Sequence, residues 1–218
     1  MAIYSICSHF FMKLFYIIDK KYDLQFAGNK LATQDLNKQY SALGNILKYT
    51  AKEYQKSWNK INCDFSLYIE KVTGYNWFYK NYYCVVSPTH AGISNWGYGN
   101  KVIRWWKENA YIQRRITAHE LILSHYFEIY RHHFSQHKLS DGQVWALAEI
   151  CAFTLTSLTP EVKKFWPWDT NGYYYSHNYP QLVSLQKTMK SIFLSRRNFN
   201  DYIVKGIKLV EKQKNIVP

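Results

Sequence analysis

The sequence has no closely spaced cysteines, and this absence removes two classes of small protein. Cys7, Cys63, Cys84 and Cys151 are far apart and form no CxxC pair. Such spacing argues against a zinc knuckle and predicts no disulfide framework. We therefore expect mostly buried thiols in a reducing compartment, so the cytoplasm is favoured over secretion.

The sequence also lacks an uninterrupted apolar run of membrane-spanning length. Its most apolar stretch, residues 1–21, is broken by His9 and Lys13 and has no basic start or clean small-residue cleavage site. Neither a transmembrane helix nor a signal peptide is therefore favoured. There is no GxSxG motif, no glycine-rich phosphate loop, and no RNP, zinc-finger or helix-turn-helix signature. The sequence therefore contains no motif that indicates a serine hydrolase, a P-loop protein or a standard nucleic-acid-binding module.

Acidic residues are few, and the resulting positive charge is the strongest feature of the composition. The chain has 28 Lys and Arg against 15 Asp and Glu, a formal net charge of +13. Such a charge attracts nucleic acid, anionic lipid or acidic protein, and it also aids solubility. The basic residues are scattered, so a solvated basic surface is the simpler interpretation. At 218 residues and 47% apolar, the chain is long enough to bury a real core.

The apolar patterns predict strands, then helices, over most of the chain. Residues 10–18 fit either a strand or a short buried helix, and an amphipathic helix is predicted from about Thr33 to Trp58. Period-two alternation or buried runs predict strands at 63–69, 82–86, 91–96 and 101–106, the last two joined as a hairpin. Helices are expected at 111–137, 144–158 and 181–213, with an aromatic loop at 160–180. Strands followed by helices indicate an α+β protein.

Five of the eight histidines fall within residues 111–137, and His119-Glu120 is the pair with the clearest chemistry. A His-Glu pair on a helix places a zinc ligand beside a general base in metallopeptidases. An HExxH helix has its second histidine where this sequence has Leu123, and the next histidine here is His125. Six residues turn His125 about 120° from His119 and about 9 Å along the axis. A π-bulge would be needed to bring both side chains to one ion.

The order of these elements resembles the zincin fold, and specifically the gluzincin branch of metallopeptidases. The resemblance covers roughly residues 61–158: a small mixed sheet, a helix with Ala-His-Glu-Leu, and a core helix with Trp-Ala-Leu-Ala-Glu. It implies one α+β domain over residues 1–218. In that domain, 1–60 is an N-terminal strand and helix region, 61–158 the zincin-like core, and 159–218 an aromatic loop with C-terminal helices.

The resemblance also implies roles for individual residues. His119 and Glu149 would bind Zn²⁺, Glu120 would be the general base, and His125 is the nearest replacement for the missing histidine ligand. An oxyanion-stabilising Tyr or His is implied in the loop after the core helix, where the candidates are Tyr173, Tyr175 and His177.

Structural interpretations compete with this metal site. Glu149 lies in an almost wholly apolar helix, where an unpaired carboxylate is expensive, and a salt bridge to Arg114, Arg115 or His119 would satisfy it. An ordinary buried hydrogen-bonded pair is the alternative for His119 and Glu120.

The other histidines of the helix have their own alternatives. His125, Glu128 and His132 share one helical face and would fit a metal as HxxExxxH, although a solvated polar face is the simpler interpretation. His132, His133 and His137 suit the negative end of the helix when they are protonated.

Three hypotheses about function follow. In the first, a zinc hydrolase of the peptidase kind uses Glu120 to deprotonate a zinc-bound water that attacks a peptide or protein substrate. In the second, a catalytically inactive zincin-like protein binds a partner through its aromatic and basic surface. In the third, a basic protein binds nucleic acid through phosphate contacts and stacking on exposed Trp or Tyr.

Overall fold

The computed structural model describes residues 11–94, 99–166, 180–213 and 216. The chain forms two compact units. Unit 1 consists of Met1–Leu67 and Tyr79–Ser124, and unit 2 consists of Tyr68–Phe78 and His125–Pro218. Among the residues described, no helix combines the length and the apolar character that a membrane crossing requires.

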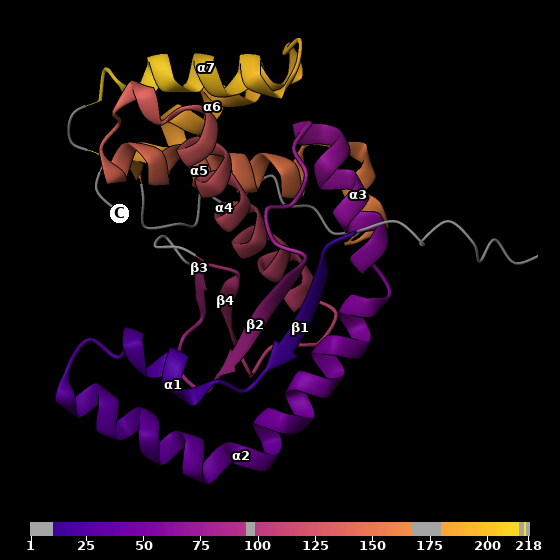
Figure 1. Ribbon diagram of the computed structural model, residues 1–218, viewed down its shortest axis with the longest axis vertical. Helices are drawn as coiled ribbons and strands as arrows, with labels where there is room; N and C mark the ends of the chain where they lie inside the picture. Colours follow the sequence, from indigo (N-terminus) through magenta and orange to yellow (C-terminus); the bar gives the residue numbers. More distant parts are fainter. Residues whose placement is uncertain (1–10, 95–98, 167–179, 214–215, 217–218) are drawn as a thin grey trace, which may run out of the picture. The chain divides into compact units, whose positions relative to one another are not determined.

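Unit 1 contains a four-stranded mixed sheet in the order β1-β2-β4-β3 (Figure 1). Strands β1 (Lys13–Ile17) and β4 (Lys101–Trp105) both pair in parallel with β2 (Asn81–Ser87). Strand β3 (Gly92–Ser94) is antiparallel to β4, which confirms the predicted pairing of these two segments. The inner strand β2 is an almost continuous apolar run because an inner parallel strand is covered on both faces.

Three helical segments lie wholly in unit 1 beside the beginnings of two further helices. They are α1 (Lys20–Asp23), the 3-10 helix η1 (Leu24–Phe26), and α2 (Lys30–Asn59), followed by the start of α3 (Asn62–Thr73) and, later in the chain, of α4 (Gln113–His133). Helix α2 begins three residues before the predicted start at Thr33. Asn29 is its N-cap, and the Asn29 side chain accepts a hydrogen bond from the backbone of Ala32.

The strand predicted at residues 63–69 is wrong, because this segment lies within helix α3. The alternating apolar residues suggested period two, but the buried positions 62, 65, 66, 69 and 73 follow helical spacing. Leu67, which the strand pattern would bury, is 51% exposed. Four alternating residues fit both periods, and the packing of Phe65 and Ile69 in the core selects the helix.

The outer edge of β1 is closed by side chains of α2 and α3. The backbone N–H groups of alternate residues along this edge donate to side-chain oxygens: Met12 to Ser66, Leu14 to Asn62, and Tyr16 to Gln55. The Asn62 and Gln55 amides donate in return to the carbonyl oxygens of Met12 and Leu14. An edge strand whose backbone groups are paired in this way is unavailable for pairing with another chain.

Unit 2 is helical. It contains the ends of α3 and α4, then the 3-10 helix η2 (Ser135–His137), α5 (Asp141–Ser157), the 3-10 helix η3 (Pro160–Lys164), α6 (Pro180–Leu194) and α7 (Phe199–Val210). Ser140 and Gln143 form a capping box at the start of α5, as the Ser-Asp-Gly-Gln sequence leads one to expect. A Cβ atom on Gly206 of α7 would lie 3.0 Å from Leu147 of α5 and 2.7 Å from Met189 of α6, so α7 packs closely on both helices.

The cysteines follow the expectation only in part. Cys84 and Cys151 are buried free thiols, whereas Cys63 is disulfide-bonded. The absence of a CxxC pair does not exclude an isolated disulfide, because the two cysteines of such a bond need only be close in space.

We predict that Asn62→Leu destabilises the protein by about 3 kcal/mol or more. The substitution removes three hydrogen bonds, from Leu14 and Trp58 and to Met12, and leaves their buried partners unpaired at about 1–3 kcal/mol each. Urea unfolding at equilibrium measures the loss. Asn45→Leu on the exposed face of α2 is the matched control, with an expected change within about 0.5 kcal/mol. Equal losses for both variants would contradict the role given to Asn62.

Candidate functional site

Glu120 of the predicted catalytic pair lies next to an arginine. Glu120 is buried on α4 in unit 1. Its Oε1 atom and the Nη1 atom of Arg104 lie 2.5 Å and 2.9 Å from the point that a Cβ atom on Gly92 would occupy. Glycine at position 92 therefore leaves room for the carboxylate and the guanidinium. A guanidinium so close stabilises the ionised carboxylate.

The same arginine holds a second carboxylate. Arg104 is buried on β4, where its Nη2 donates to Glu108 and its Nη1 donates to the carbonyl of Ala91. Burial is the main cause that raises the pKa of the Cys84 thiol. The nearby Arg104 lowers this pKa, whereas Glu120 raises it. In unit 1, Glu120 thus belongs to a buried group of charges centred on Arg104, an arrangement that stabilises a fold as readily as it supports chemistry.

The three zinc ligands implied by the resemblance lie on two helices. His119 and His125 are both buried on α4, which is a regular α-helix without a π-helical turn. Glu149 lies on α5 in unit 2 and is only half-buried, so water reaches it more readily than its apolar neighbours suggested. Over the described part of the chain, no group of three or more His, Cys, Asp or Glu side chains is arranged to hold a metal ion. The zinc site stays a prediction from the sequence.

The implied oxyanion residues Tyr173, Tyr175 and His177 lie outside the described residues. The structure therefore assigns them no place.

The alternative metal site on α4 is occupied by ion pairs. Glu128 is buried and lies 2.5 Å from Arg131 and 3.6 Å from His132. His125, one turn earlier, packs against Trp77 and Phe78 with ring centroids 4.6 Å and 5.6 Å away. This face is solvated only at His132, whose side chain is 59% exposed, because His125 is packed on aromatic rings and Glu128 is buried and paired.

His125 itself is an unusual buried group. Its side chain is 1% exposed, and neither ring nitrogen has a hydrogen-bond partner among the described residues. Burial lowers the pKa of His125 from its ordinary value of 6.5 to about 3, so the imidazole is neutral at pH 7. A neutral imidazole among aromatic rings behaves as a flat, weakly polar core side chain.

One polar group that the sequence gave no reason to select is centred on Asp23. Asp23 is 0% exposed, its Oδ1 lies 2.6 Å from Nδ1 of His90, and the Tyr40 hydroxyl donates to its Oδ2 at 2.7 Å. These residues are far apart in the sequence and share no motif, so only the fold brings them together. A buried carboxylate with two partners ties three segments of unit 1 to one point.

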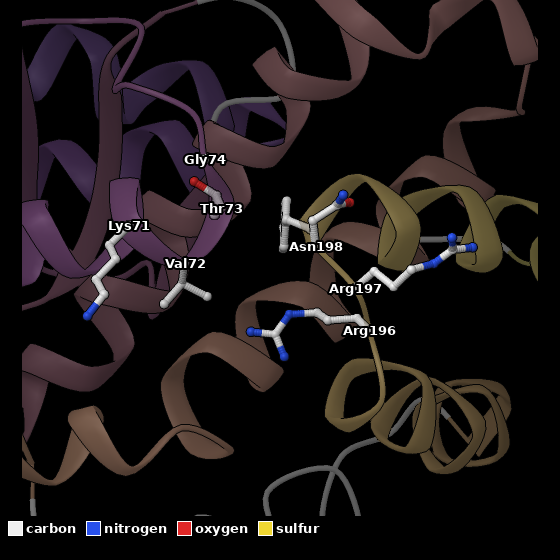
Figure 2. Close-up of a pocket in the computed structure, with 8 residues that line it drawn as sticks. Lys71, Val72, Thr73, Gly74, Arg196, Arg197 and Asn198 are labelled. Atoms are coloured by element: carbon white, nitrogen blue, oxygen red, sulfur yellow. The ribbon is translucent and has the colours of Figure 1, made fainter.

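A further candidate site is a basic pocket of about 500 Å³ in unit 2, between the end of α3 and the start of α7 (Figure 2). We call it the basic pocket. Its lining residues are Lys71, Val72, Thr73, Gly74, Arg196, Arg197, Asn198 and Phe199. Three of these eight side chains are basic and none is acidic.

A hydrogen bond and a ring contact, both to Phe193, hold the Arg196 side chain in place. Figure 2 shows Arg196 extending toward Val72 and Lys71, and Arg197 extending the other way along α7. Nη1 of Arg196 donates to the Phe193 carbonyl at 2.5 Å, and its guanidinium lies 3.6 Å from the centre of the Phe193 ring. A guanidinium fixed through one edge keeps its other N–H groups for a ligand.

The two helix ends contribute opposite ends of their dipoles to the pocket. Gly74 ends α3 with a φ of +76°, and its N–H donates to the Glu70 carbonyl, while the Thr73 hydroxyl donates to the Ile69 carbonyl. The Glu70 and Ile69 carbonyls therefore have donors, whereas the last carbonyls of α3 form the negative end of its dipole, which disfavours an anion. At the other wall, Asn198 caps α7 by accepting from the Asp201 backbone, and the first N–H groups of a helix favour anions.

Comparison of the chain with protein-family models, with curated proteins and with solved structures finds no match. The site is therefore judged on its own geometry.

We predict that His125→Phe removes part of the acid sensitivity of the fold. The folded-state pKa of about 3 lies below the ordinary 6.5, so the unfolded state binds more protons between these values and stability falls as pH falls from about 6.5 to 3. As the pH falls through this window, the free energy of unfolding of the wild type should decrease relative to that of the variant. The expected change is up to about 1.4 kcal/mol for each pH unit.

Urea unfolding at a series of pH values measures this difference. At pH 7 the variant should be at least as stable as the wild type, because it replaces two unpaired buried nitrogens by carbon. His133→Phe, at an exposed position on the same helix, is the control. A difference that does not depend on pH for His125→Phe would contradict the neutral, buried state of this side chain.

A second prediction concerns zinc. Because Glu120 lies beside Arg104, we expect protein purified without an affinity tag to retain less than one equivalent of zinc by elemental analysis. His119→Ala should leave the metal content unchanged. One zinc per chain that is lost in the variant would restore the hydrolase hypothesis.

Proposed function

We propose that this protein is a binding protein that holds a phosphate-bearing ligand in the basic pocket of unit 2. The observation that carries the proposal is the lining of the pocket, where Lys71, Arg196 and Arg197 are the ionisable residues. Lysine and arginine are the side chains that proteins use most for phosphate. A concave site with charge of one sign concentrates its field and attracts the opposite charge.

The size of the pocket suits a ligand larger than a simple ion. Its volume of about 500 Å³ is within the range of about 300–1,000 Å³ in which small-molecule sites fall. Val72 and Phe199 give the pocket an apolar part beside its basic part. An isolated phosphate would fill only a fraction of this space, which favours a ligand that carries its phosphate on a larger body.

The charges around the pocket support the same class of ligand. The nearest acidic side chain on α7, Asp201, lies 2.8 Å from Lys205 and 4.0 Å from the Arg197 guanidinium, and it accepts a hydrogen bond from the backbone of Arg197. Its charge is thus offset by two basic side chains, of which only Arg197 lines the pocket. The net charge of +13 adds a long-range attraction for polyanions that salt weakens.

The zinc hydrolase remains the alternative that rests on the His119-Glu120 motif. It would need a metal-bound water within reach of Glu120, and the buried Arg104 beside Glu120 weighs against this role. The proposal of a binding protein agrees with the second hypothesis drawn from the sequence, without requiring a zincin fold.

We predict that Lys71→Gln weakens the binding of inorganic pyrophosphate about tenfold, the loss expected for one charge-assisted contact. Lys71 is exposed on the last turn of α3, so its replacement should leave the fold intact. Isothermal titration calorimetry at low salt measures the affinity. Arg197→Gln should have a smaller effect, because its side chain is 87% exposed and extends away from Lys71.

Lys163→Gln is the matched control, since it removes one exposed charge from unit 2 outside the pocket. The affinity of this variant for pyrophosphate should stay within about twofold of that of the wild type, because an exposed charge that does not contact the ligand contributes little to binding. Equal weakening by Lys71→Gln and Lys163→Gln, or no binding at all, would contradict the proposal.

A further inference from the structure

Four aromatic side chains form a row of rings in unit 2, which we call the ring row: Tyr75, His133, His132 and Phe78. Their ring centroids are separated by 4.8 Å from Tyr75 to His133, 6.3 Å from His133 to His132, and 5.1 Å from His132 to Phe78. The last two rings are nearly parallel, at 13°. Two of the rings come from the loop after α3 and two from the last turn of α4.

The ring row is open to solvent. The side chain of His132 is 59% exposed, His133 is exposed, and Tyr75 and Phe78 are half-buried. Packing supports the row from below, because Phe78 also lies against the buried His125 ring. Rings that are held in place and remain accessible are the kind of surface on which planar ligands stack.

The ring row begins where the basic pocket ends. Tyr75 directly follows Gly74 of the pocket, and its hydroxyl donates to Oδ1 of Asn200 at 2.7 Å, two residues after the pocket residue Asn198. This hydrogen bond ties the first ring to the start of α7. Both features lie within unit 2, and the loop after α3 contributes Gly74 to the pocket and Tyr75 and Phe78 to the row.

The one carboxylate beside the row is already paired. Glu128 lies 3.6 Å from His132, but it is buried and lies 2.5 Å from Arg131. It therefore presents little negative charge to an anionic ligand at the row.

We propose that the phosphate-bearing ligand is a single-stranded nucleic acid, with a backbone phosphate in the basic pocket and unstacked bases on the ring row. The inference rests on the proposed function, because it assigns the pocket to a phosphate of the chain. Stacking on aromatic rings beside a basic groove is the general way in which single strands are bound without sequence preference. In a duplex the base faces are already stacked on one another and are closed to such rings.

The number of rings separates this ligand from a free nucleotide. The His132 and Phe78 rings cover one face of each other, so bases contact the solvent-exposed sides of the row. A chain of nucleotides brings several bases to these exposed rings, whereas a mononucleotide brings one. The parts of this site come from residues 71–78, 132–133 and 196–200, and none of these segments carries a recognised sequence signature.

The test is fluorescence anisotropy with a labelled oligothymidylate of about 12 nucleotides, within the site sizes of about 4–16 nucleotides known for single-strand binders. His132→Asn with His133→Asn removes two exposed rings and retains polar side chains. This double variant should bind the oligonucleotide about tenfold more weakly or worse. Its affinity for pyrophosphate should stay within about twofold of the wild type, since it keeps the pocket. His137→Asn, near the same helix end but outside the row, is the control.

A second variant, Tyr75→Leu, keeps the bulk of the side chain and removes the first ring. It should reproduce the loss of oligonucleotide binding, and circular dichroism with thermal unfolding confirms that each variant is folded. Lys71→Gln should weaken both the oligonucleotide and pyrophosphate, because both use the pocket. A duplex of the same length should bind more weakly than the single strand.

The outcomes separate the two proposals. If the ring variants bind the oligonucleotide as the wild type does while Lys71→Gln weakens both probes, the single-strand inference is overturned and the phosphate pocket stands. If Lys71→Gln weakens neither probe, the proposed function fails. Duplex binding as tight as single-strand binding, or binding of a phosphoserine peptide in place of the oligonucleotide, would also overturn the inference.

Discussion

The hydrogen bonds along the outer edge of β1 are the interaction on which unit 1 depends. An edge strand presents unpaired backbone groups, and here Gln55, Asn62 and Ser66 supply their partners. These side chains are one or two turns apart on α2 and α3, so the strand can be satisfied only when both helices are formed. Trp58, which is fully buried, donates to the same Asn62 oxygen that Leu14 uses. The sheet edge, two helices and the aromatic core thus stabilise one another.

Charged groups have different roles in the two units. In unit 1 the buried Arg104 lies beside Glu108 and Glu120, and the buried Asp23 lies 2.6 Å from a ring nitrogen of His90. Such groups offset each other's cost of burial. In unit 2 the pocket has no acidic lining residue, and Lys71 is exposed with Arg196 extending toward it, whereas Arg197 points away and lies 4.0 Å from Asp201. The second arrangement leaves a charge for a ligand to neutralise, and this difference is why we place the function in unit 2.

The sequence predicted the parts of the fold in which pattern and packing agree. The apolar run of β2, the antiparallel pair β3 and β4, and the core helix α5 are confirmed. The strand at 63–69 was wrong because Phe65 and Ile69 fit two periods, and only the tertiary core selects between them. Boundaries also depended on caps, as Asn29 shows at the start of α2.

The candidate sites were harder to predict. His119 and Glu120 stood out because they resemble a motif, yet Arg104 beside Glu120 comes from strand β4, 16 positions earlier in the sequence. The basic pocket joins Lys71 to Arg196, and no spacing rule connects residues so far apart. Net charge indicated that an anion was a suitable partner, but it did not indicate where one would bind.

The most direct measurement is to map the ligand contacts by photo-crosslinking the protein to a single strand that contains 4-thiothymidine, followed by peptide mass spectrometry. The account predicts cross-linked peptides from residues 71–78 and 132–133, the loop and helix end that carry the ring row. It also predicts that excess pyrophosphate lowers their yield. Cross-links confined to unit 1, or spread evenly over the basic surface, would contradict the assignment of the function to the basic pocket.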